Sequence, residues 1–175
     1  MGKIKRDIYS RLVHPYRRFA RIYREFRALW KNYAYQSFMA TLVIFLVFWL
    51  LSAEEAVIVA SIGSTAFIVF TMPTSLTAKS RRVIGGHITG LLCGILGAFI
   101  LSQWVIPMIL VYSVTVGLSI FLMVALDFEH PPASGTALGV AISGFSFKIL
   151  IAILTSAAIL SLAHHYMKKY LKDLI

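Results

Sequence analysis

Three ionisable side chains lie close together between two long apolar stretches of this sequence. They are Asp127, Glu129 and His130, and a proline pair, Pro131 and Pro132, follows them directly. Ionisable groups beside hydrocarbon are costly, so in an apolar chain they indicate a functional site. We therefore treat this segment as the first candidate site, with the three ionisable residues as candidates for carrying a coupled proton.

The proline pair predicts the start of a helix made of small residues. Proline is favoured in the first helical turn, and the residue before a proline is held extended. The first N–H groups and the positive end of the helix dipole can bind an anion. The residues expected around such an anion are His130, Pro131, Pro132, Ser134, Gly135 and Thr136. The alternative is a tight connection between helices that His130 merely caps, and spacing alone does not decide between the two.

Two other segments are candidates for the opposite wall of this site. The triplet Gly63-Ser64-Thr65 resembles the start of the proline-led helix, although small residues also serve close helix packing. Arg82 and His87 lie five residues apart, about 7 to 8 Å along a helix. We expect Arg82 to attract an anion and His87 to face protein or water. Simple membrane anchoring and a packing histidine are the alternatives.

The remaining residue patterns do not indicate an enzyme. The five histidines include no pair at metal-ligand spacing, and no phosphate-binding loop or nucleophile set is present. We therefore expect no bound metal, no cofactor and no catalytic residue.

The composition is that of a protein that crosses a membrane several times. Hydrophobic residues make up 59% of the 175 residues, and the mean hydropathy is +0.81. Long charge-free runs separate the charged residues, and one span needs roughly 20 apolar residues. Six apolar segments are predicted, at residues 35–51, 56–71, 83–101, 108–126, 132–144 and 149–166. The fifth is too short for an ordinary span and is expected to be a half-helix or a re-entrant element.

The positive charge indicates orientation in a membrane rather than nucleic-acid binding. The net charge is +10, and ten of the 17 Lys and Arg residues lie between Lys3 and Lys31. Positive residues favour the cytoplasmic side, so we expect six crossings in the cell's inner membrane with both termini cytoplasmic. Residues 1–32 are predicted to be a basic amphipathic helix, broken or kinked at His14-Pro15. Such a helix suits either an anionic lipid surface or packing against the membrane domain or a neighbouring subunit.

The two halves of the apolar region resemble each other. Residues 63–67 match residues 134–138 at an offset of 71, and after an insertion at 72–79 the offset falls to 66. We predict two repeats, residues 33–103 and 104–168, followed by a cytoplasmic tail at 169–175. Three segments per repeat make the repeats antiparallel, which is the inverted design of many secondary transporters.

Two motifs resemble the HPP family of integral membrane proteins. One runs from Gly63-Ser64-Thr65 through Pro73 to His87, and the other is His130-Pro-Pro-Ala-Ser-Gly-Thr-Ala-Leu138. Members of that family in cyanobacteria and chloroplasts are linked to nitrite transport. The resemblance therefore implies a transported anion such as nitrite, although residues 74–81 depart from the usual family pattern.

These observations predict an all-α, polytopic membrane bundle that oligomerises with itself. The expected function is a transporter or channel for a small inorganic anion, with the site at the start of the proline-led helix. The alternative is a non-transporting adaptor that recruits a soluble partner through its basic N-terminal helix.

Overall fold

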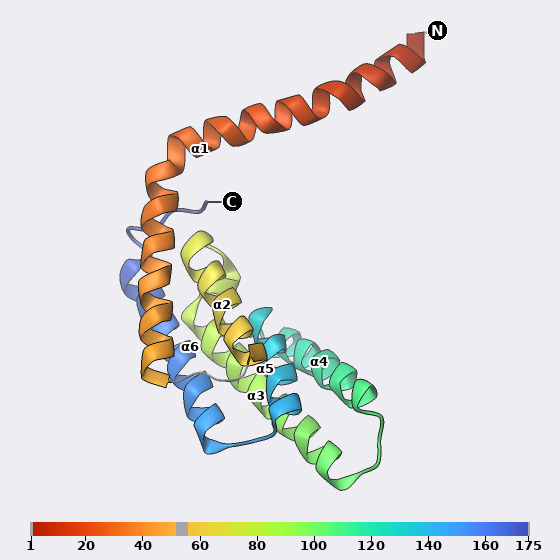
Figure 1. Cartoon of the computed structure of the whole chain (residues 1–175), viewed down its shortest axis with the longest axis vertical. Coiled ribbons are helices and arrows are strands. Elements are labelled where there is room, and N and C mark those ends of the chain that lie inside the picture. The colour runs from red at the N-terminus through yellow and green to blue at the C-terminus, as the bar shows by residue number, and fades with distance from the viewer. Residues whose placement is uncertain (1, 52–55, 175) are drawn as a thin grey trace.

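The structure is a computed structural model that describes residues 2–51 and 56–174, and every regular element in those ranges is a helix (Figure 1). The helices are α1 (Gly2–Leu51), α2 (Ala56–Thr71), the short 3-10 helix η1 (Leu76–Ala78), α3 (Ser80–Gln103), α4 (Met108–Ala125), α5 (Pro132–Ser143) and α6 (Phe147–Met167). The predicted all-α class is confirmed, and the second to sixth predicted segments match α2 to α6 within about three residues at each end. The first predicted segment, 35–51, is instead the C-terminal part of α1, which is continuous with the predicted N-terminal helix. The acidic pair Glu54-Glu55 lies outside the described residues.

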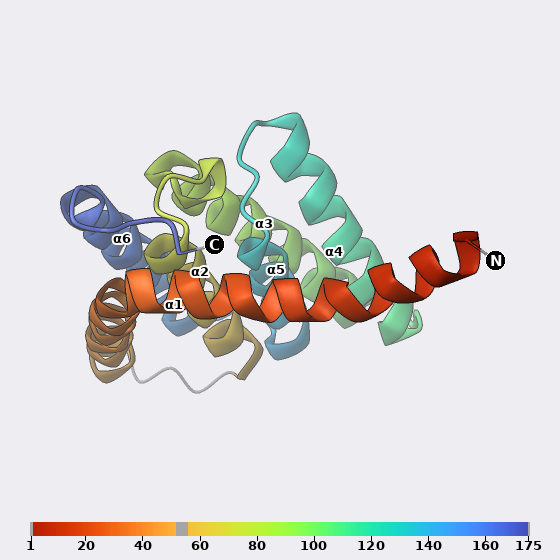
Figure 2. The same cartoon turned by 90° about the horizontal axis from the view of Figure 1, so that it is seen from above.

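Among the described residues, four helices are long and apolar enough to cross a membrane. They are the 22–49 part of α1, then α3, α4 and α6. Helix α2 has 16 residues and α5 has 12. At 1.5 Å per residue these measure about 24 and 18 Å, less than the roughly 30 Å of a hydrocarbon core. The two short helices lie inside the bundle between the long ones, so the chain is a multi-pass membrane protein with two short inner helices (Figures 1 and 2).

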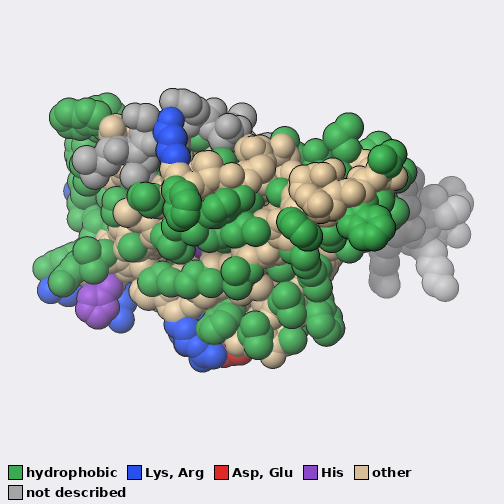
Figure 3. All heavy atoms as spheres, turned by 90° about the horizontal axis from the view of Figure 1, so that it is seen from below, with side chains coloured by type: hydrophobic (Ala, Val, Ile, Leu, Met, Phe, Trp, Pro, Cys, Tyr) green, Lys and Arg blue, Asp and Glu red, His purple; other side chains and the backbone are tan. Residues whose placement is uncertain are grey.

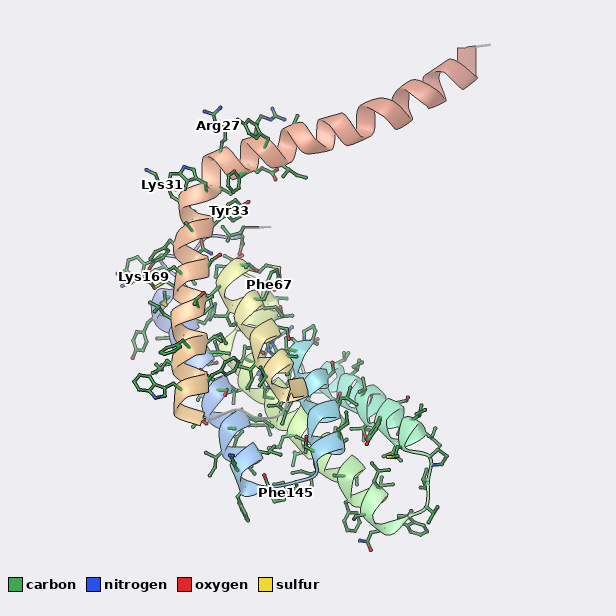
Figure 4. All side chains as sticks on the ribbon, in the orientation of Figure 1. Arg27, Lys31, Tyr33, Phe67, Phe145 and Lys169 are labelled. Carbon is green, nitrogen blue, oxygen red and sulfur yellow. The ribbon has the colours of Figure 1, made fainter. Side chains whose placement is uncertain are left out.

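Helix α1 is continuous through His14-Pro15, so of the predicted break or kink at that position the break is wrong. Its sharpest change of direction lies instead near Lys31 and Tyr33, where the N-terminal half turns away from the bundle (Figure 4). Just before this bend, Tyr23 and Trp30 are exposed. The N-terminal half therefore extends sideways from the end of the membrane-spanning half.

One end of the bundle, which we call the basic end, collects most positive residues beyond α1. Arg82, at the start of α3, pairs with Asp127, which follows α4. The Nε2 atom of His164, near the end of α6, lies 2.8 Å from the carbonyl oxygen of Pro73. Figure 3 shows Lys and Arg side chains at the margins of a largely hydrophobic face. This distribution is the one expected for helices that alternate in direction across a membrane.

The C-terminal residues 170–174 fold back over the basic end, and we call them the C-terminal strap. The Gln36 side chain of α1 donates to the carbonyl oxygen of Lys172 at 2.9 Å and accepts from its N–H at 3.1 Å. The Leu174 N–H donates to the carbonyl oxygen of Thr71 at 2.9 Å. The strap therefore ties the end of α6 to the end of α2 and to the middle of α1.

The helix contacts follow the pattern that a two-fold repeat requires. Exchanging α1 with α4, α2 with α5 and α3 with α6 converts every major helix pair either into another observed pair or into itself. For example, α3 packs on α5 and α6 packs on α2, while the pairs α2–α5 and α3–α6 map onto themselves. The pattern agrees with the predicted repeats, whose boundaries and antiparallel relation remain predictions.

Glycines allow unusually close packing between α3 and α5. A Cβ atom added at Gly90 would collide with the carbonyl oxygen of Ala133, and one at Gly94 would lie 2.7 Å from that of Ala137. In the symmetry-related pair, α2 and α6 pack through larger side chains, including Ile62 and Ile153. The α3–α5 pair is thus fixed backbone against backbone.

Candidate functional site

Five polar side chains meet where α2, α3 and α5 come together, and we call them the polar centre. They are Ser61 and Thr65 of α2, His87 of α3, His130 just before α5, and Thr136 of α5. Each is at most 3% exposed. Buried polar groups need partners, so such a cluster within an apolar bundle is a costly arrangement that indicates function.

His87 bridges two threonines on opposite helices. Its Nε2 atom lies 3.0 Å from the hydroxyl oxygen of Thr65, and its Nδ1 atom lies 2.8 Å from that of Thr136. The two threonines are 71 residues apart, the offset of the predicted repeat. His87 therefore sits between corresponding residues of the two halves.

His130 joins the same cluster from the loop before α5. Its Nε2 atom lies 3.0 Å from the Thr65 hydroxyl, and its Nδ1 atom lies 2.9 Å from the carbonyl oxygen of Thr77 in η1. The rings of His87 and His130 are 5.2 Å apart between centroids. Both candidate histidines thus share Thr65.

Ser61 completes the centre, and our sequence analysis missed it. Its hydroxyl lies 2.8 Å from that of Thr136 and donates to the carbonyl oxygen of Pro132 at 2.6 Å. Ser61 precedes Thr65 by four residues, so the two lie on one face of α2. That spacing was the available signal, because Ser64 lies on a different face of the helix.

Local sequence explains how the histidines reach each other. The small residue Gly86 lets α3 approach the loop, since a Cβ atom there would lie 2.7 Å from the His130 Cβ. Pro132 occupies the first turn of α5, as predicted, and Pro131 precedes it. The glycine next to His87 and the two prolines after His130 therefore set the distance between the rings.

Charged residues flank the centre at the basic end without entering it. Arg82 pairs with both Asp127 and Glu129, the latter at 2.7 Å, and the exposed Arg81 pairs with Asp127 at 3.1 Å. Two guanidinium groups thus face two carboxylates, so their charges balance. The expectation that Arg82 attracts an anion therefore lacks support in this state, and Asp127 is held in ion pairs outside the hydrogen-bonded centre.

A cavity of about 230 Å³ lies beside the centre, and it shares His130 with it. Three residues of α4 form its apolar wall, and Glu129, Pro131 and Ser134 form the other side. One water molecule occupies about 30 Å³ in the liquid, so the cavity has room for a small hydrated solute. Several predicted site residues thus lie in the sealed centre, and others line the adjoining cavity.

Two predicted contacts differ from the structure. Ser64 is exposed and donates to carbonyl oxygens of its own helix at Ala60 and Ser61. Ser134 likewise donates to the carbonyl oxygen of Pro131 and lines the cavity instead of the centre. Helix periodicity is the reason, because residues adjacent in sequence point about 100° apart.

The start of α5 also lacks the free N–H groups that the anion prediction assumed. The Ala133 N–H donates to the carbonyl oxygen of His130 at 2.9 Å, and the Ser134 N–H donates to that of Pro131 at 3.1 Å. Gly135 faces Ser61 at ordinary contact distance. Any ligand at this position must therefore be bound by side chains rather than by the backbone of the first turn.

Among the described residues no group of three or more His, Cys, Asp and Glu side chains is placed to hold a metal ion. The centre offers two imidazoles and three hydroxyls. These groups can exchange hydrogen bonds with a small polar solute, and the imidazoles can also accept a proton.

Comparison with known proteins gives one clear result. No curated protein and no solved structure matches the chain. The model of the HPP transmembrane region matches residues 25–172, which includes α2 to α6 and the whole polar centre. Because this match covers most of the sequence, the chain belongs to the HPP family of membrane proteins.

Proposed function

We propose that this protein transports a small inorganic anion across the membrane, with the polar centre as its binding site. The observation that carries the proposal is the chemistry of the centre. It contains hydroxyls and imidazoles but no carboxylate, so the only charge it can acquire near neutral pH is positive. A positive centre within an apolar bundle favours an anion as its partner.

The sealed state of the centre supports an alternating mechanism rather than an open pore. Thr65, His130 and Thr136 are fully buried, so a solute reaches them only after helices move. The adjoining cavity, which contains His130 and Ser134, is the expected entry from the basic end. We propose that this end faces the cytoplasm, because it collects Arg81, Arg82 and the lysines after α6.

Nitrite is the anion to test first, because of the family resemblance described above. The experiment is uptake of labelled nitrite by proteoliposomes that contain the purified protein, with and without an imposed pH gradient. We expect uptake above that of protein-free vesicles, accelerated when protons accompany the anion inward. Chloride and nitrate as competitors define selectivity.

A His130→Gln variant is the key comparison, since the side chain lies in both the centre and the cavity. We expect it to lose most uptake while the exposed control His165→Gln retains it. If wild-type vesicles take up none of these anions under any gradient, the transport proposal is wrong. A non-transporting adaptor that uses the exposed N-terminal half of α1 then becomes the better explanation.

A further inference from the structure

We propose that His87, rather than His130, is the residue that binds the coupled proton, and that Thr136 and Ser61 stabilise it by turning their hydroxyl groups. This inference rests on the proposed function for its link to anion binding. The proton site itself follows from the hydrogen-bond geometry of the polar centre.

The carbonyl oxygen of Thr77 fixes the tautomer of His130. A carbonyl only accepts, so the Nδ1 atom of His130, 2.9 Å away, must carry a hydrogen. In neutral imidazole the other nitrogen then accepts, and its partner is the Thr65 hydroxyl at 3.0 Å. The Thr65 hydrogen is thereby committed to His130.

The same reasoning continues to His87. Since Thr65 donates to His130, its oxygen must accept from the Nε2–H of His87. The Nδ1 atom of neutral His87 then accepts from the Thr136 hydroxyl at 2.8 Å. The donor and the acceptor of every hydrogen bond in this network thus follow from the carbonyl group of Thr77.

When both histidines are neutral, this hydrogen-bond network has one hydrogen too few around Ser61. Its hydroxyl has one hydrogen, yet it lies 2.6 Å from the Pro132 carbonyl oxygen and 2.8 Å from the Thr136 oxygen. With the Thr136 hydrogen committed to His87, one of these close oxygen pairs has no hydrogen between its atoms. Unpaired buried polar contacts of this kind are unfavourable.

A proton added to Nδ1 of His87 removes this shortage. The new N–H donates to Thr136, the Thr136 hydroxyl turns to donate to Ser61, and the Ser61 hydroxyl donates to the Pro132 carbonyl. One N–H bond forms with a proton from solvent, and no other covalent bond changes. The hydroxyls only rotate.

A proton on His130 would instead affect the contact between the Thr65 hydroxyl and the Ser61 carbonyl oxygen, whose atoms lie farther apart. It would release the Thr65 hydroxyl to donate to the carbonyl oxygen of Ser61, 3.0 Å away. The closer oxygen pairs at the Ser61 hydroxyl would still share one hydrogen too few. With rings 5.2 Å apart, two cations repel strongly, so only one histidine is expected to be charged at a time.

The surroundings of His87 explain why the proton and an anion should bind together. The nearest charges are Arg82, Asp127 and Glu129, and these are paired with one another at the basic end. The described parts of α2 and α5 carry no ionisable side chain, and α4 carries only Tyr112, near its start. In α6, Lys148 lies at one end, and His164, His165 and Tyr166 lie at the other. A cation on His87 therefore has no carboxylate within the centre, and a bound anion would provide the missing counter-charge.

Nitrogen NMR of the full-length protein in nanodiscs tests the proton site directly. Labelling histidine with ¹⁵N reports which ring nitrogens carry hydrogen, and His87→Gln and His130→Gln spectra assign the signals. At high pH we expect hydrogen on Nε2 of His87 and on Nδ1 of His130. On acidification His87 should become doubly protonated first. Double protonation of His130 first, or hydrogen on Nδ1 of neutral His87, would overturn the proposal.

Two serine variants separate a specific role of Ser61 from general damage. Ser61→Ala removes the acceptor of the turned Thr136 hydroxyl, so the pH at which His87 becomes charged should fall by about one unit. Ser64→Ala, on an exposed face of the same helix, should leave it unchanged. Equal behaviour of the two variants would contradict the role of Ser61.

Adding nitrite separates this inference from the transport proposal. If both are correct, nitrite raises the pH at which His87 becomes charged. If His87 takes the first proton but nitrite changes nothing, the proton assignment stands and nitrite binding at the centre is wrong.

Discussion

The two halves of the bundle place matching threonines on either side of the polar centre, yet they differ in everything around them. At the repeat offsets Thr65 corresponds to Thr136, but His87 corresponds to Ile153 and Gly90 to Ser156. The first repeat therefore supplies His87 and the glycines that pack against α5. At the corresponding positions the second repeat has an apolar residue and a serine. A symmetric scaffold with an asymmetric centre can hold a proton on one side while the helices of the other side move.

The packing contrast has a mechanical meaning. Helices α3 and α5 contact through backbone atoms, so they are expected to move as one body. Helices α2 and α6 contact through flexible apolar side chains that include Ile62 and Leu160. Motion that exposes the centre is therefore expected between these pairs rather than within α3–α5. Four pairs of variants test differences between regions of the molecule, beginning with this packing contrast.

The largest effect is expected from Gly90→Ala, compared with Ser156→Ala at the corresponding position. The new Cβ atom of the first variant meets the Ala133 carbonyl oxygen, which cannot rotate away. We expect a loss of about 3 kcal/mol in the free energy of unfolding, against under about 1 kcal/mol for Ser156→Ala. Thermal unfolding in detergent measures both. Similar melting temperatures of the two variants would contradict the close backbone packing of α3 on α5.

The next effect distinguishes the two matched threonines. Thr65→Val leaves one nitrogen of each histidine without its partner, whereas Thr136→Val affects only His87 and the Ser61 contact. Each unsatisfied buried group costs about 1–3 kcal/mol, so Thr65→Val should destabilise more. Chemical unfolding of the two variants gives the comparison. Equal losses would imply that the two halves of the centre are energetically alike.

A smaller effect is expected for the C-terminal strap, which has no described counterpart at the other end of the bundle. Gln36→Leu removes the hydrogen bonds between α1 and Lys172. We expect a loss of about 1–2 kcal/mol, because nearby water can replace part of the bonding. Hydrogen exchange at the Lys172 amide should accelerate as well. The exposed Gln103→Leu is the control, and unchanged exchange in Gln36→Leu would contradict the role of the strap.

The smallest effect is expected at the exposed ion pair. The Arg81 side chain is 65% exposed, so Arg81→Gln should cost between about 0 and 1 kcal/mol. The Arg82 side chain is 16% exposed and contacts both carboxylates, so Arg82→Gln should cost more. Melting temperatures at low and high salt compare the variants. A larger loss of stability for Arg81→Gln than for Arg82→Gln would show that burial does not determine the strength of these ion pairs.

The helices were predictable because membrane spans carry a strong signal. Runs of apolar residues, interrupted by charge or proline, located α2 to α6, and Pro132 marked the start of α5. The length of α1 was not predictable in this way. Proline usually ends a helix, but the helix continues through Pro15.

The site was predicted only in part, for a geometric reason. Thr65, His87, His130 and Thr136 were chosen by chemistry and repeat symmetry, and they do meet. Ser64 was chosen by sequence proximity to Thr65, although the helix turns it away. Ser61 was missed because one serine in an apolar helix looks like a packing residue. The charge balance between Arg82 and the two carboxylates needs the tertiary contact between α3 and the loop after α4.

The C-terminal strap also has a consequence for anyone who purifies this protein. An affinity tag fused after Ile175 would follow the segment that hydrogen-bonds Gln36 and Thr71, and its bulk or charge would compete with those contacts. The N-terminal end of α1 lies far from the bundle (Figure 1). Tags, fluorescent reporters and fiducial domains for cryo-microscopy therefore belong at the N-terminus.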